Sequence, residues 1–288
     1  MENSRPLKLI ECPRDAMQGI SEFIPTQKKI NYLNALMKVG FDTIDFGSFV
    51  SSRTIPQLKD TEEVLEQLDL NGKKSKLLAI VANQRGAETA VKWQAIDYLG
   101  YPFSVSEVFQ KRNTNKSIAE SEKLVDTLLD ICGSNDKELV VYISMAFGNP
   151  YREAWSAAVV EKWCEKLANK GVRILSLSDT IGTSNPESIS HLFAKLIRDL
   201  PQVEFGAHLH TTPSTWYEKV EAAYDSGCLR FDGAIKGFGG CPMADDRLVG
   251  NMPMEKLVSF AQTRHVETGI NPLAFENAYN KALETFPS

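Results

Sequence analysis

The chain has 288 residues and a formal net charge of −5, with 43% hydrophobic and 24% charged residues. This composition excludes intrinsic disorder and is typical of a globular protein with one large core. The acidic excess disfavours nucleic acid as a partner, because nucleic-acid binders usually carry a basic patch. No apolar run approaches the roughly 20 residues that span a bilayer, and residues 1–10 lack the apolar stretch of a signal peptide.

The cysteines and histidines are few. The five cysteines are Cys12, Cys132, Cys164, Cys228 and Cys241. Their odd number and wide spacing do not suit a disulfide framework, so we expect a reducing, cytoplasmic location. Two of the four histidines, His208 and His210, are separated by a single residue.

Short apolar segments alternate with longer helical patterns along the whole chain. The segments expected to form strands are Leu7–Cys12, Thr43–Val50, Leu77–Ala82, Leu99–Val105, Leu139–Met145, Val172–Ser178, Val203–His210 and Leu229–Ile235. The segments expected to form helices are Thr26–Val39, Thr61–Leu68, Ala87–Ile96, Ile118–Cys132, Ala154–Asn169, Pro186–Asp199, Ser214–Ser226, Met254–Thr263 and a terminal Pro272–Thr285. Ser117 and Glu120 match a capping box, and Pro186 suits the first turn of its helix.

This alternation predicts parallel strands. Eight strand–helix units with no break in composition predict an α/β protein, a TIM (β/α)8 barrel with an extra C-terminal helix. Residues 1–288 would then form one catalytic domain. A doubly wound open sheet is the alternative architecture.

Polar side chains follow the predicted strands where a barrel places its active site, at the C-terminal strand ends. They are Arg14, Asp15, Asp45, Asn83, Arg85, Asp179, His208, His210 and the loop from Lys236 to Pro242. Although they are distant in sequence, the barrel would bring them to one mouth.

The pair His208 and His210 favours a metal site, because residues i and i+2 of a strand point to the same face. With Asp15, two imidazole nitrogens and carboxylate oxygen would suit Mg²⁺, Mn²⁺ or Zn²⁺. Two histidines lining the mouth without a metal are the alternative. Asn251 would either add an oxygen ligand or cap the helix that follows it.

Other residues at the mouth have open interpretations. Arg14 could stabilise a developing enolate, while Asp45 either binds substrate or pairs with Arg14. Asp179 either orients a ligand or holds the barrel together by hydrogen bonds. Cys241 lies in the glycine-rich segment 237–242, which would be either a loop that delivers an acid or nucleophile or a plain turn. The other four cysteines are expected to be packing residues.

Several motifs resemble the 3-hydroxy-3-methylglutaryl-CoA lyase family. Glu-Cys-Pro-Arg-Asp-Ala-Met-Gln at 11–18 is similar to its opening motif, and Ser-Phe-Val-Ser with residues 55–65 resembles its second block. Leu-Ser-Asp-Thr-Ile-Gly at 177–182 and Ala-His-Leu-His at 207–210 match its sixth and seventh strands. Gly-Phe-Gly-Gly-Cys-Pro-Met-Ala at 237–244 matches its signature loop and is the most specific part of the resemblance.

The resemblance implies a TIM-barrel metallolyase that uses Mg²⁺ or Mn²⁺ to split its substrate into acetyl-CoA and acetoacetate. It therefore implies an acyl-CoA substrate, a role in leucine catabolism and ketone-body metabolism, and a homo-oligomer, expected to be a dimer. From the composition and hydropathy, neither nucleic acid nor a membrane is expected as a partner. By position, the metal ligands would be Asp15, His208, His210 and Asn251. Asp15 or His208 would transfer a proton, Arg14 would contact the substrate, and Cys241 would be the catalytic cysteine.

Some positions depart from the family pattern. Ala16 lies where the family usually has glycine, Asp45 where it has glutamate, Thr211 where it has aspartate and Met243 where it has tyrosine. Before Pro150, Asn149 lies where the family has cysteine. The basic residues that we associate with the CoA phosphates are not evident in residues 19–24. A related barrel lyase, aldolase or condensing enzyme acting on a different hydroxy acid or acyl-CoA is the first alternative, and a metal-binding homologue without turnover is the second.

Overall fold

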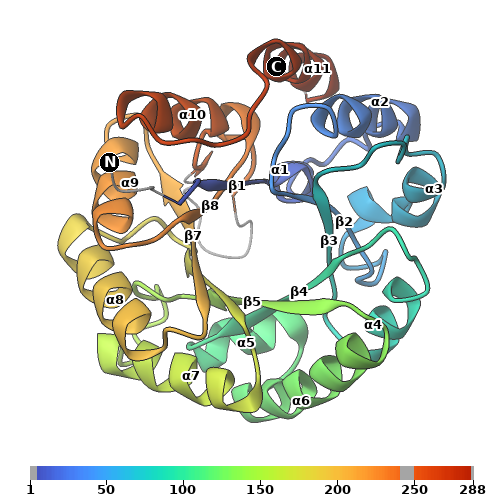
Figure 1. The fold of residues 1–288 in the computed structure, drawn as a ribbon. Helices are drawn as coiled ribbons and strands as arrows, with labels where there is room; N and C mark the ends of the chain where they lie inside the picture. Colours follow the sequence, from blue (N-terminus) through green and yellow to red (C-terminus); the bar gives the residue numbers. More distant parts are fainter. Residues whose placement is uncertain (1–4, 241–249, 287–288) are drawn as a thin grey trace.

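The computed structural model describes residues 5–240 and 250–286. Its first eight strands are β1 (Lys8–Glu11), β2 (Thr43–Ser48), β3 (Lys76–Ile80), β4 (Tyr98–Ser104), β5 (Glu138–Ser144), β6 (Ile174–Asp179), β7 (Glu204–Thr211) and β8 (Arg230–Gly233). They pair in parallel in the order β6-β5-β4-β3-β2-β1-β8-β7, and β6 pairs with β7 to close the ring (Figure 1). The predicted TIM barrel is therefore confirmed, and the open sheet is excluded.

Helices surround the barrel (Figure 1). They are α1 (Pro13–Gln18), α2 (Thr26–Leu36), α3 (Thr61–Glu66), α4 (Gln84–Ala90), α5 (Glu107–Thr114), α6 (Ile118–Ser134), α7 (Ala157–Lys170), α8 (Pro186–Asp199), α9 (Trp216–Asp225), α10 (Met254–Thr263) and α11 (Pro272–Thr285). The predicted terminal helix is α11, which packs against α2. None of the helices in the described ranges is both long and apolar enough to cross a membrane.

Local signals set several helix ends. Ser117 and Glu120 form the predicted capping box of α6, and Pro186 opens α8 behind the N-cap residue Asn185. The short helices α1 and α5 lie in segments for which no helix was predicted. A two-residue strand, β9 (Gly250–Asn251), pairs antiparallel with β7 and was also not expected.

The core has two parts because the barrel strands are buried on both faces. The larger cluster fills the space between strands and helices, while a smaller one fills the barrel interior with Leu78, Ile80, Tyr98, Val140, Tyr142 and Ile174. Cys12, Cys132, Cys164 and Cys228 are buried free thiols, which fits the packing role expected for them.

Glu11 is a buried carboxyl group outside the barrel mouth. Its Oε1 accepts hydrogen bonds from the backbone N–H of Ile235 at 3.0 Å and from the hydroxyl of Tyr32 at 3.3 Å. Its Oε2 has no hydrogen-bond partner in the part of the chain that the structure describes. Burial raises the pKa of Glu11, and the two hydrogen bonds lower it by less, so that the pKa is about 8. Folding therefore favours the protonated carboxyl.

We expect Glu11 to make the protein less stable as the pH rises. Its pKa is raised in the folded state. The contribution of Glu11 to the free energy of unfolding is therefore fully present below about pH 4.5 and is lost as the pH rises through about 8. The full change is on the order of 5 kcal/mol at about 1.4 kcal/mol per pKa unit. In Glu11→Gln, urea unfolding at pH 5 and pH 8.5 should show a smaller pH dependence than in the wild type. The exposed Glu63→Gln is the control, and an unchanged dependence in Glu11→Gln would contradict the assignment.

Candidate active site

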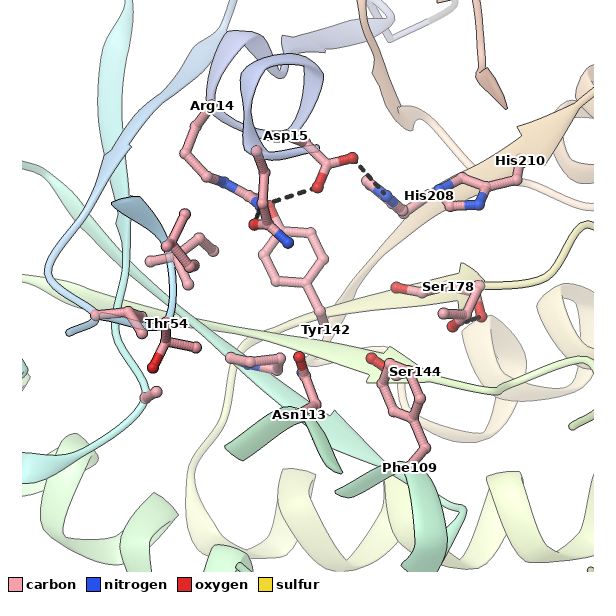
Figure 2. Close-up of a pocket in the computed structure, with 17 residues that line it drawn as sticks. Arg14, Asp15, Thr54, Phe109, Asn113, Tyr142, Ser144, Ser178, His208 and His210 are labelled. Atoms are coloured by element: carbon pink, nitrogen blue, oxygen red, sulfur yellow. Dashed lines mark hydrogen bonds and ion pairs between the residues drawn. The ribbon is translucent and has the colours of Figure 1, made fainter. Parts of the chain in front are cut away.

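A cavity opens at the mouth of the barrel, at the C-terminal ends of the strands. Its polar lining includes Arg14, Asp15, Tyr142, Ser144, His208 and His210 (Figure 2). Its apolar lining includes Val50, Ile55, Ile80 and Phe109. The predicted residues Arg14, Asp15, His208 and His210 are thus brought to one cavity from the two ends of the chain.

Arg14 and Asp15 reach the cavity from α1, the single turn and a half of helix that directly follows β1. Pro13 occupies the first turn of this helix, where its missing N–H has no cost. The guanidinium of Arg14 is buried and donates from Nε and Nη2 to Asp45, at 3.0 and 2.5 Å to Oδ2. From Nη1 it donates to Asp15 Oδ1 at 2.9 Å and to Gln18 Oε1 at 2.9 Å.

Asp45 lies within β2, is fully buried and does not line the cavity. Of its two interpretations, the structure supports the pair with Arg14. Burial opposes the charge of Arg14, but Asp45 and Asp15 raise the pKa of its guanidinium further above its usual value. Arg14 is therefore a fixed cation whose side chain Asp45 orients, and one N–H of Nη2 is not used by these bonds.

Asp15, His208 and His210 form a cluster that suits a cation. One ligand atom from each lies within 4.8 Å of the others. Nε2 of His208 is 4.0 Å from Asp15 Oδ2, which is too long for a hydrogen bond between them. Nε2 of His210 is buried without a hydrogen-bond partner among the described residues. A buried nitrogen of this kind is costly unless a ligand satisfies it.

The charge states of Asp15 and His210 also suit a metal ion. Burial alone would raise the pKa of Asp15, but Arg14 and both histidines lower it to about 2. Burial, together with the neighbouring His208, lowers the pKa of His210 to about 4. Asp15 is therefore a carboxylate and His210 a neutral imidazole near pH 7, the forms in which both residues ligate metal ions.

Asn251 lies beside this cluster because β9 pairs it with His210. Its Nδ2 donates to Asp15 Oδ2 at 2.8 Å and to the backbone carbonyl of Phe238 at 2.9 Å. The alternative of a helix cap is wrong, because the N-cap residue of α10 is Pro253 and has no side-chain cap. A rotation of the amide by half a turn would present its oxygen to the cluster instead.

A second cluster, Cys12, His208 and Asp232, also has ligand atoms within 4.8 Å of one another. It differs from the first because Cys12 and Asp232 are almost fully buried and do not line the cavity. Nδ1 of His208 is already hydrogen-bonded to Asp232 at 3.0 Å. The first cluster is therefore the candidate metal centre.

Asp179 ends β6 but lies behind the cavity wall. Its Oδ2 accepts hydrogen bonds from Lys219 Nζ at 2.7 Å and from Ser184 Oγ at 2.5 Å. Lys219 also donates to the backbone carbonyl of His210 at 3.0 Å. Among the two expected roles, these contacts favour the structural one, in which Asp179 and Lys219 hold the strand end that carries His210.

Cys241 lies outside the described residues. The segment that leads to it is fixed at Gly239, which has a φ of +88°. A Cβ at this position would lie 2.7 Å from the backbone oxygen of Asp15. Only glycine fits there, so the backbone before Cys241 runs directly against the segment that carries Asp15.

Sequence reasoning missed several residues of the site. Gln18 contacts Arg14, and Tyr142 packs against His208. Asp232 contacts His208 from inside the barrel, beneath the cavity. A charged residue inside a barrel strand was the available signal for Asp232, but the interior or exterior face of β8 could not be assigned from the sequence.

The fold and the site define a class, a TIM-barrel enzyme with a histidine–carboxylate centre at its mouth. A solved lyase for HMG-CoA from Acinetobacter baumannii, in complex with coenzyme A and 3-methylmalate, has a TM-score of 0.89 and 29% sequence identity to this chain. The match covers 97% of this chain and 91% of that one.

The HMGL-like family model matches residues 8–280, and the chain belongs to this family. It is 31% identical to the hydroxymethylglutaryl-CoA lyase YngG of Bacillus subtilis, over 90% of this chain and 85% of that protein. It is also 31% identical to the mitochondrial hydroxymethylglutaryl-CoA lyase of Homo sapiens, over 92% and 81% of the two chains. The predicted family and the predicted class of enzyme, a carbon–carbon lyase, are confirmed.

Proposed function

We propose that this protein is a divalent-metal-dependent lyase that cleaves 3-hydroxy-3-methylglutaryl-CoA to acetyl-CoA and acetoacetate. The observation that carries the proposal is the cluster of Asp15, His208 and His210 with the fixed cation Arg14 beside it, at one cavity of a barrel that belongs to the HMGL-like family. Residues 1–288 act as one catalytic domain.

The metal would be held by Asp15, His208, His210 and the amide oxygen of Asn251. Two imidazole nitrogens and two oxygens suit Mn²⁺ or Mg²⁺, and Zn²⁺ is compatible with the same donors. When bound, the ion supplies a Lewis acid that lowers the pKa of the substrate hydroxyl. The orphaned Nε2 of His210 and the low pKa of Asp15 support this assignment.

Proton transfer from the tertiary hydroxyl falls to Asp15. A lone pair of His208 Nε2 that holds a cation cannot also take a proton, whereas a carboxylate has lone pairs for both tasks. Once the hydroxyl proton has moved to Asp15, the bond between the second and third acyl carbons breaks. Its electron pair passes to the acetyl-CoA fragment as an enolate, and the third carbon becomes the ketone of acetoacetate.

Arg14 stabilises the enolate through the N–H of Nη2 that Asp45, Asp15 and Gln18 leave free. Because Asp45 holds the guanidinium in place before the reaction, little reorganisation is needed when the charge develops. Cys241 then donates the proton that converts the enolate to acetyl-CoA.

The segments that follow three of the barrel strands support an acyl-CoA substrate. Arg53, Arg85 and Arg112 are exposed in segments that follow β2, β3 and β4. Their positive charge suits the phosphate groups of CoA. Residues 19–24, where such charge was sought in the sequence, do not provide it. The solved relative that was bound to coenzyme A has the same fold at 29% identity. Relatives occur in mitochondria as well, so the cytoplasmic location stays a prediction.

We expect the purified protein to release acetyl-CoA from 3-hydroxy-3-methylglutaryl-CoA when Mn²⁺ is present and not after removal of metal by EDTA. A coupled assay of acetyl-CoA measures this, with Cys241→Ser expected to be slow. Mn²⁺ binding without cleavage would contradict the substrate and favour a different acyl-CoA or hydroxy acid. Cleavage that is insensitive to EDTA would contradict the role of the metal.

A further inference from the structure

The side chain of His208 rests on a buried polar layer inside the barrel. Arg230 and Asp232 are two residues apart on β8 and so share the interior face. Asp232 is only 2% exposed, and its Oδ2 is 3.0 Å from Nδ1 of His208. This contact leaves Nε2 as the only ring nitrogen of His208 that is free to face the cavity.

A second contact fixes the plane of the His208 ring. The ring of Tyr142 on β5 meets it edge-on, with centroids 5.7 Å apart and an interplanar angle of 83°. With Asp232 below and Tyr142 at the side, the ring has little freedom to rotate. Nε2 is thereby directed toward Asp15, as Figure 2 shows.

Arg230 and Asp232 interact electrostatically inside the barrel: burial opposes the charge of Arg230, but Asp232 raises the pKa of its guanidinium. Arg230 is 1% exposed, and its Nη1 reaches Glu204 at 3.2 Å at the far end of the barrel. Gly206 leaves room for it, since a Cβ there would lie 3.2 Å from Arg230 Cδ. Within the described ranges, two donors of Arg230 (Nε and Nη2) and one acceptor of Asp232 (Oδ1) lack hydrogen-bond partners. Unpaired donors and an unpaired acceptor thus lie together inside the barrel. Such a layer is the usual setting of a buried water molecule.

We propose that Asp232 is a positioning residue of the metal centre: it holds the proton of His208 on Nδ1 and so presents the Nε2 lone pair to the cation held by Asp15 and His210. Carboxylates that accept from a ligating imidazole fix its tautomer and strengthen it as a ligand. This inference rests on the proposed metal site and assigns a role that lies outside the cavity lining.

The first test uses Mn²⁺ alone. In apo-protein, free Mn²⁺ followed by electron paramagnetic resonance should show Asp232→Asn binding about 10–100-fold more weakly than the wild type. The matched control is Asp60→Asn, another buried carboxylate, whose partner is Lys29 at 2.7 Å. It should lose stability without losing Mn²⁺ affinity. Equal affinities of Asp232→Asn and the wild type would overturn the proposal.

The second test needs no folded Asp232 variant. Nitrogen-15 NMR of metal-free wild type above the titration range of its imidazoles should show His208 with its proton on Nδ1, the resonance being assigned by its loss in His208→Ala. A proton on Nε2 would overturn the proposal. If the wild type instead shows the Nδ1 tautomer but binds no Mn²⁺, the proposed metal-dependent function fails while the contact assigned to Asp232 stands.

Discussion

Replacing His210 with alanine is expected to weaken Mn²⁺ binding by more than about 100-fold, because loss of a residue that merely orients a ligand already costs about 10–100-fold. His210 contributes a neutral nitrogen that is buried and without a partner among the described residues. Removing it leaves Asp15, His208 and the amide oxygen of Asn251 as the remaining ligands of the proposed site. Titration of apo-protein with Mn²⁺ measures the affinity, and the coupled assay should show a parallel loss of cleavage.

The control for this variant is His191→Ala. His191 lies on α8, is exposed, and has its Nε2 3.1 Å from the side chain of Glu161. Its loss should change neither Mn²⁺ affinity nor cleavage. If His210→Ala binds Mn²⁺ as tightly as the wild type, then His210 is not a ligand, and the alternative of two histidines lining the mouth without a metal regains support.

The convergence of Asp15, His208 and His210 could be predicted because it depends on two regular features. Alternate residues of a strand share a face, and all eight strands of a parallel barrel end at one mouth. Neither feature requires knowledge of side-chain contacts. The same reasoning placed Arg14 at the mouth, although it did not predict the helix α1 that the residues after β1 form.

Asn251 and Asp232 show where such reasoning ends. The strand β9 has two residues, which is too short for a periodic pattern, and it forms only because it pairs with the distant end of β7. Asp232 could be recognised as a charged residue in a buried strand, but its contact with His208 depends on the register between β7 and β8. Contacts of this kind are set by tertiary packing rather than by local sequence.

Asp45 and Asp179 illustrate a related point. Because they lie at or near strand ends, the sequence left a role toward the substrate or a ligand open for both, beside a structural role. In the structure each is paired with a buried cation, Asp45 with Arg14 at 2.5 Å and Asp179 with Lys219 at 2.7 Å. A buried carboxylate needs such a partner to offset its desolvation, but the sequence does not reveal which cation provides it.

Replacing Arg14 with lysine is expected to lower kcat by about 10²–10³-fold, the usual cost of removing one donor that stabilises a developing oxyanion. Lysine keeps the positive charge but lacks the planar fork that contacts Asp45, Asp15 and Gln18 together. If the lost contact forms only when the enolate develops, kcat and kcat/KM should fall equally. Steady-state kinetics with 3-hydroxy-3-methylglutaryl-CoA and saturating Mn²⁺ measures both.

Two further variants separate this effect from a loss of structure. Arg198→Lys changes an exposed arginine on α8, paired with Asp199, and should leave the kinetics unchanged. Arg14→Met leaves Asp45 buried without its cation and should lower the free energy of unfolding by about 3–5 kcal/mol, whereas Arg14→Lys should lower it less because the charge is retained. A wild-type kcat in Arg14→Lys would show that Asp45 and Arg14 form a structural pair alone, and that another group stabilises the enolate.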